Sequence, residues 1–109
     1  VDGFFIDNCD VYYYDPHESI FVGITAILQN IMTFGKAVII NGGDTYVAEY
    51  RERYGDIDHI MTGVNQESVW SSIDFDSGTF REQTSETRDY FCKYLETCKA
   101  DGVEVYLLE

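Results

Sequence analysis

Four short apolar segments alternate with three segments of helical character, and this alternation limits the folds that the chain can adopt. The expected strands are a run that ends before Asp7, residues 36–41, residues 57–65 and residues 103–109. Strands that alternate with helices form parallel sheets, because each helix returns the chain to the same end of the sheet. The sequence therefore predicts an α/β fold with the order βαβαβαβ.

Local signals mark the expected ends of the first two helices. Asp15 followed by Pro16 is typical of a helix start, with Asp15 as the N-cap and Pro16 as the first helical residue. Apolar residues then recur at helical spacing until Gly35, which is typical of a helix end. A second helix is expected to follow the turn at residues 42–45 and to end at Gly55.

The stretch before the third helix is polar and longer than most connections in α/β folds. Residues 66–83 are therefore expected to form a long loop, and long loops at strand ends are often binding loops. Thr84 or Ser85 is expected to cap the helix that follows.

The length of 109 residues allows at most one domain, so residues 1–109 are expected to form a single unit. A closed eight-stranded α/β barrel needs about 200 to 250 residues, so this unit is expected to be a small domain or a segment of a larger one. The sequence lacks an initiator Met and begins and ends within strand-like segments, as an excised segment would. Neither a signal peptide nor an apolar run of about 18 residues is present.

The charge of the chain opposes two classes of partner. Seven Lys and Arg residues against twenty Asp and Glu residues give a formal net charge of −13. Like-charge repulsion disfavours nucleic acid and anionic lipid surfaces. The same charge would attract a cationic ligand, although it is also typical of a solvated acidic surface.

The cysteines and histidines do not indicate a metal or disulfide site. Three cysteines are an odd number, and Cys92 and Cys98 lie too far apart along one expected helix to bond. His17 and His59 have no Cys or Asp partner at a metal-ligand spacing. A Mg²⁺ site at the two aspartates after the first strand is a minor alternative, so no metal and no cofactor are predicted.

Polar residues lie at or just after the carboxyl ends of three of the expected strands. Because strand side chains alternate, Asp7, Asn41 and Glu67 can each lie on one face at the carboxyl end of a strand. If the three faces are the same, these side chains converge at the edge where α/β enzymes carry out chemistry. Simpler roles stay open: Asp7 as a cap or turn residue, Asn41 as a turn residue, and Glu67 as an exposed loop acid.

Aromatic residues follow both proposed carboxylates. Residues 12–14 are three tyrosines, and Trp70 comes shortly after Glu67. These rings, Tyr12 among them, could stack on a sugar or another flat ligand, or they could pack in the core. Glu109 has the parity of Val105 and is either a further site residue or a plain carboxylate at the chain end.

Four segments carry a specific pattern: Asp2-Gly-Phe-Phe-Ile-Asp-Asn-Cys-Asp10, the strand end Asn41-Gly-Gly43, the strand before Glu67, and Val105-Tyr-Leu-Leu-Glu109. Together they resemble the polygalactosaminidase-like hydrolases of glycoside hydrolase family 114 over essentially the whole chain. The resemblance implies a (β/α)8 TIM barrel, of which this chain would be about half, corresponding to strands four to seven.

The resemblance also implies a retaining glycosidase. Asp7 would be the nucleophile, ionised at rest, and Glu67 the protonated general acid/base, with carboxyl groups about 5 to 5.5 Å apart. Asn8, Asp10 and Asn41 would line the sugar site. The implied substrate is an α-1,4-linked galactosamine polysaccharide, and the implied location is extracellular or at the cell surface.

A barrel fragment that is catalytically incomplete stays open as an alternative, and so do two other classes of protein. One is a carbohydrate-binding or surface module without turnover that uses the rings of residues 12–14 and Trp70. The other is a flavodoxin-like monomer that accepts a phosphoryl group in an acidic pocket at Asp7 and Asp10. No Lys follows a strand end to hold such a group, which disfavours this class. Half a barrel is expected to self-associate through its open sheet edges, whereas a flavodoxin-like monomer has none to pair.

Overall fold

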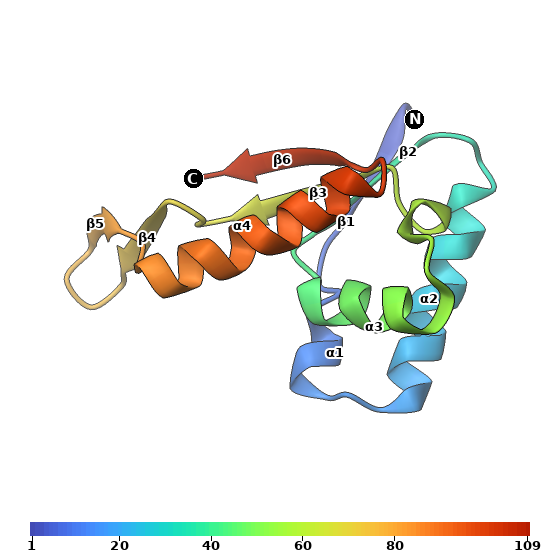
Figure 1. Ribbon diagram of the computed structural model, residues 1–109, viewed down its shortest axis with the longest axis horizontal. Coiled ribbons are helices and arrows are strands. Elements are labelled where there is room, and N and C mark those ends of the chain that lie inside the picture. Colours follow the sequence, from blue (N-terminus) through green and yellow to red (C-terminus); the bar gives the residue numbers. More distant parts are fainter.

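The computed structural model describes residues 1–109 and is built on one parallel sheet (Figure 1). Its strands lie in the order β1-β2-β3-β6, and all neighbours pair in parallel. Their bounds are β1 Gly3–Ile6, β2 Ala37–Asn41, β3 Gly63–Glu67 and β6 Glu104–Leu108. The predicted α/β class with a parallel four-stranded sheet is therefore confirmed.

The helices lie on one side of this sheet (Figure 1). They are α1 Val11–Tyr14, α2 Glu18–Met32, α3 Asp44–Tyr54, the short 3-10 helix η1 Ile57–His59, and α4 Ser85–Ala100. The Thr84 hydroxyl caps α4 by accepting from the backbone N–H of Thr87 at 3.3 Å, as predicted. None of the helices combines the length and hydropathy that a bilayer-spanning helix needs.

The start of α2 differs from the prediction. Asp15 is the C-cap of α1, and it lies three residues before the next helix begins, so it does not cap that helix. The helix begins at Glu18 instead, with His17 as its N-cap, and the carbonyl of His17 accepts from the N–H of Ile20 at 3.0 Å.

The third strand is also shorter than predicted. Residues 57–59 form η1, and Ile57, Ile60 and Met61 are fully buried without belonging to a strand. An apolar run alone does not distinguish a buried strand from a buried turn of helix. Strand β3 begins only at Gly63.

Residues 66–83 are not the single loop that the sequence predicted. They contain the antiparallel hairpin of β4, Ser71–Asp74, and β5, Thr79–Glu82. Its turn is closed by Gly78, whose left-handed backbone has a φ of 68° and whose N–H donates to the carbonyl of Asp74 at 2.8 Å. The hairpin projects beyond the carboxyl end of β3 (Figure 1).

The core fills the layer between the sheet and the helices. Val38, Ile40 and Val64 point from the strands into this layer and are fully buried. Tyr46 is also fully buried, and its ring packs 5.3 Å from that of Phe21, measured between centroids. The strands thus carry apolar residues on both faces of the sheet, and the helices cover only the face with Val38, Ile40 and Val64.

The opposite face of the sheet is uncovered. Phe5, Tyr106 and Leu108 are 58%, 43% and 54% exposed there. Strands β1 and β6 each pair with only one neighbour, so both edges of the sheet are open. Parallel sheets are normally covered on both faces, so this face has the character of an interior surface.

The hydroxyl of Tyr46 gives a test of the core. It lies 2.7 Å from the hydroxyl of Thr25, which also donates to the carbonyl of Phe21 at 2.8 Å. Tyr46→Phe removes one buried hydrogen bond and should lower the free energy of unfolding by about 1 kcal/mol in urea denaturation. The control Tyr54→Phe changes an exposed ring and should stay within about 0.5 kcal/mol; equal losses would contradict this packing.

Candidate functional site

A chain of hydrogen bonds joins the carboxyl ends of three strands. Asn41 Nδ2 donates to Asp7 Oδ1 at 3.2 Å, and Asn65 Nδ2 donates to Asn41 Oδ1 at 2.8 Å. The backbone N–H of Asn8 donates to the same Asp7 Oδ1 at 2.9 Å. Both donors therefore bind Asp7 Oδ1, and neither of them binds Asp7 Oδ2.

Strand register places these residues. Asn41 is the register partner of Asn65 across β2 and β3, and Ile6, next to Asp7, is the partner of Ile40. Register partners in a parallel sheet point to the same face. Asp7, Asn41 and Asn65 therefore lie in one row at the carboxyl edge, on the uncovered face.

Glu67 ends β3 on the same face, two residues beyond Asn65, and is exposed. In the pairing of β3 with β6, Glu67 lies opposite Leu108. Of the predicted trio, Asp7 and Asn41 touch directly, whereas Glu67 lies farther out along the edge with an unpaired carboxylate.

Asp10 and Asn8 shape the loop after β1. Asn8 adopts a left-handed backbone with a φ of 70°, which turns the chain out of the strand. Asp10 Oδ1 accepts from the N–H of Gly43 at 2.9 Å, and a Cβ at Gly42 would lie only 2.7 Å from Asp10 Oδ2. The backbone at Gly42 is also left-handed, with a φ of 65°, a conformation that favours glycine. Burial raises the pKa of Asp10 despite the bond from Gly43, and the negative charge of Asp44 adds to the rise.

The structure corrects the position expected for Tyr12. Its ring is only 8% exposed and packs edge-on against Phe21 and Tyr46, because α1 turns this side chain toward α2 and α3. Tyr13 and Tyr14 point outward and are 64% and 81% exposed. The exposed rings of this segment are therefore residues 13 and 14.

Trp70 and Glu109 meet at the base of the hairpin. Trp70 is half-exposed, and the guanidinium carbon of Arg88 lies 5.6 Å from the centroid of its ring. The carboxylate of Glu109 accepts from the backbone N–H groups of Val69, Trp70 and Ser71 at 2.9–3.2 Å, and from the Ser71 hydroxyl at 2.8 Å. Glu109 therefore binds the chain where the hairpin begins.

The hydrogen bonds that Glu109 accepts from residues 69–71, and by which it caps the start of the hairpin, also change the pKa of its carboxyl group. Burial alone would raise the pKa of Glu109, but the hydrogen bonds from Ser71, Trp70 and Val69 together outweigh it and lower the pKa. Glu109 is thus held as an anion by the segment that it caps.

Two contacts of the site were not predicted from the sequence. Asn65 shares a face with Glu67 by strand alternation, but its bond to Asn41 depends on the register of β2 and β3. The contact between Arg88 and Trp70 depends on the hairpin, which was expected as a loop. Cys9, Cys92 and Cys98 are free, and no three His, Cys, Asp or Glu side chains are grouped to hold a metal ion.

Comparison of the structure with solved structures identifies its fold. The glycoside hydrolase domain of PelA from Pseudomonas aeruginosa matches with a TM-score of 0.71 over 95% of this chain, at 20% sequence identity. The chain has the fold of part of a glycoside hydrolase domain. A variant of the same PelA domain matches equally well, at 19% identity. The predicted resemblance to a glycoside hydrolase is thus confirmed at the level of the fold.

The match covers only part of the relative. This chain spans 40% of the length of either PelA structure. No model of a known protein family matches the sequence, and no curated protein matches it.

The Glu109 cap gives a prediction with a defined pH dependence. A carboxyl whose pKa is lowered by folding stabilises the folded state above its ordinary pKa, and this stabilisation is lost as the pH falls through the folded-state pKa. Glu109→Gln should therefore lower the hydrogen-exchange protection of the Trp70 and Ser71 amides at pH 7 by up to about tenfold. The difference from wild type should vanish in acid.

The matched control is Glu82→Gln, which changes an exposed carboxylate on β5 of the same hairpin. It should leave both amides protected. Unchanged protection in Glu109→Gln, or the same loss in both variants, would contradict the capping role.

Proposed function

We propose that this chain is part of a retaining glycoside hydrolase that acts on an amino-sugar polysaccharide. Asp7 is the nucleophile and Glu67 the general acid/base. The observation that carries the proposal is the hydrogen-bonded row of Asp7, Asn41 and Asn65 at the carboxyl edge of a glycoside hydrolase fold. Active sites of α/β barrels are built at this edge.

The anchoring of Asp7 fits the role of a nucleophile. The N–H of Asn8 and the amide of Asn41 both bind Oδ1, so the carboxylate is oriented while Oδ2 is left to attack. Asn41 is oriented in turn by Asn65. A reacting group held by neighbours that are themselves held keeps the geometry that catalysis requires.

The proposed reaction has two steps. Asp7 Oδ2 attacks the anomeric carbon while Glu67 gives its proton to the leaving glycosidic oxygen, which forms a glycosyl ester and releases the first product. Glu67 then takes a proton from water, and the resulting hydroxide displaces Asp7 from the anomeric carbon. The sugar leaves with its original anomeric configuration.

The positions of Asp7 and Glu67 on the sheet support their proposed roles as nucleophile and general acid/base. Neighbouring strands are about 4.8 Å apart and the rise along a strand is about 3.3 Å per residue, so Asp7 and Glu67, two strands and two residues apart, are separated at the backbone by about 10 Å across the sheet and about 7 Å along it. Both side chains extend from the same face, and the curvature of a barrel would bring their carboxyl groups closer toward the barrel axis. A separation of about 5 to 5.5 Å is the retaining geometry.

The net charge of the chain and the side chains near the row of Asp7, Asn41 and Asn65 bear on the proposed substrate. A net charge of −13 is compatible with a polymer that carries protonated amines, such as the α-1,4-linked galactosaminide that the resemblance implies. Asn8, Asp10, Asn41 and Trp70 are the proposed sugar contacts. For Tyr12 and Glu109, whose side chains are engaged by the protein itself, the proposed contribution is support of the loops that carry these contacts. An extracellular or cell-surface location belongs to the same proposal.

The uncovered face of the sheet fits an incomplete barrel. Phe5, Tyr106 and Leu108 are apolar and exposed on the face that would line a barrel interior. We propose that residues 1–109 form one barrel segment, and that further β/α units or a second copy of this chain cover this face and pair with β1 and β6.

A carbohydrate-binding module without turnover is the second candidate. The half-exposed ring of Trp70, with Arg88 against it, favours this reading because a sugar can stack on such a ring without any chemistry.

Replacement of Glu67 separates these two candidates. Wild type, incubated with galactosamine oligosaccharides, should yield shorter products by mass spectrometry, and Glu67→Gln should lower the rate by about 10²- to 10⁴-fold because it removes the proton donor. Binding of the oligosaccharide to the variant should persist.

Glu52→Gln is the matched control, because it makes the same change on an exposed part of α3. It should keep the wild-type rate. Full activity in Glu67→Gln would remove Glu67 from the mechanism, and binding by wild type without cleavage would favour the binding module or a barrel segment that is inactive until it is completed.

A further inference from the structure

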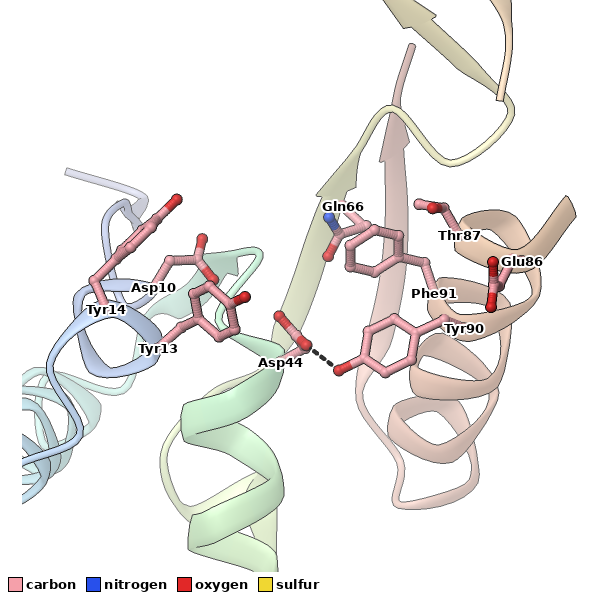
Figure 2. Close-up of a pocket in the computed structure, with 9 residues that line it drawn as sticks. All are labelled: Asp10, Tyr13, Tyr14, Asp44, Gln66, Glu86, Thr87, Tyr90 and Phe91. Atoms are coloured by element: carbon pink, nitrogen blue, oxygen red, sulfur yellow. Dashed lines mark hydrogen bonds between the residues drawn. The ribbon is translucent and has the colours of Figure 1, made fainter. Parts of the chain in front are cut away.

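A second cleft lies on the helical side of the sheet, away from the row of Asp7, Asn41 and Asn65. It has a volume of about 600 Å³ and lies between α1, the start of α3 and the start of α4 (Figure 2). Gln66 lines it from β3, on the opposite face of the strand from Asn65 and Glu67. The cleft therefore lies on the other face of the sheet from the row of Asp7, Asn41 and Asn65, although it shares Asp10 with the proposed sugar contacts.

The charged groups of this cleft are all acidic. Asp10, Asp44 and Glu86 line it, and no Lys, Arg or His does. The hydroxyl of Tyr90 donates to Asp44 Oδ2, and this bond raises the pKa of Tyr90 to about 12, so the phenol stays a neutral donor (Figure 2). Burial raises the pKa of Asp10, and the negative charge of Asp44 raises it further. The cleft thus holds negative charge that no protein cation neutralises.

Gln66 adds an acceptor that lacks a donor. The residue is only 8% exposed, and its Nε2 donates to the carbonyl of Glu67 at 3.3 Å. Its Oε1 is buried and has no hydrogen-bond partner. Figure 2 shows this oxygen directed toward the side of the cleft where Asp44 lies. A buried acceptor without a donor costs free energy, which a ligand with an N–H group would recover.

Aromatic rings form the two walls. Tyr13 and Tyr14, with centroids 5.2 Å apart, lie on the α1 side, and Tyr90 and Phe91, with centroids 5.3 Å apart, lie on the α4 side (Figure 2). Asp44 lies between the two pairs. Aromatic faces around a carboxylate attract an organic cation through both charge and the ring quadrupole.

We propose that this cleft binds a small organic ammonium ion with an apolar body. The ammonium N–H groups bind Asp44, Asp10 and Gln66 Oε1, and the body of the ligand lies between the two pairs of rings. A bare metal ion fits less well, because the acidic groups are not clustered closely enough to coordinate one. The cleft shares Asp10 with the proposed sugar contacts, but binding of an ammonium ion there does not require glycosidase activity.

The test uses the intact 109-residue chain and NMR titration of its amide signals. The probe is benzylammonium, and two analogues separate the contributions: benzyl alcohol has the ring without the charge, and benzyltrimethylammonium has the charge without N–H groups. Benzylammonium should shift the signals of Tyr13, Gln66 and Tyr90 saturably, and it should bind at least about tenfold more tightly than either analogue.

Variants assign the binding to the carboxylates. Asp44→Asn keeps an acceptor for the Tyr90 hydroxyl but removes the charge, and it should weaken benzylammonium binding about tenfold. Glu86→Gln changes an exposed lining residue in the first turn of α4, and it should weaken binding to a smaller extent. Glu52→Gln removes the same charge from α3 outside the cleft and should leave the affinity unchanged.

Three results would overturn the proposal. They are the absence of saturable shifts at the cleft, equal affinity for benzyl alcohol and benzylammonium, and an equal loss of affinity in Glu52→Gln and in the two cleft variants. Circular dichroism of every variant shows whether its fold is intact, and Glu86→Gln decides the question if Asp44→Asn is unfolded.

Discussion

The register of β1, β2 and β3 is the constraint on which the rest of the structure depends. The backbone ladder places Asn41 beside Asn65 and Asp7 at the end of the neighbouring strand, so their side chains form one hydrogen-bonded row. A slip of one residue in any strand would turn its polar side chain into the helical layer. The bond from Gly43 to Asp10 holds the turn after β2 against the loop after β1 and so supports the same register.

The two faces of the sheet separate two kinds of surface. On one face Val38, Ile40 and Val64 build the core, and at its carboxyl end Gln66 opens into the acidic cleft. On the other face the row that begins with Asp7 stands at the edge of an uncovered apolar surface. Adjacent residues, Gln66 and Glu67, thus point to different proposed sites, because strand side chains alternate.

The sequence predicts the parallel sheet well because buried strands and helix signals are local. It also places Asp7 and Asn41 together, since alternation along each strand puts both at the carboxyl end of neighbouring strands. It does not predict the hairpin, because Ser71–Asp74 and Thr79–Glu82 are short and polar and become strands only by pairing with each other. The burial of Tyr12 and the capping by Glu109 depend on contacts with segments distant in sequence. Such contacts leave no periodic signal.

Trapping of the covalent intermediate tests the central claim, that Asp7 is a nucleophile oriented by Asn41, most directly. The chain would be incubated with a fluorinated galactosaminyl fluoride, which slows hydrolysis of a glycosyl ester, and then digested for peptide mass mapping. The account predicts one added sugar on the Asp7 side chain, absent from Asp7→Asn. A sugar on another carboxylate, or cleavage of substrate with Asp7 unmodified, would contradict it.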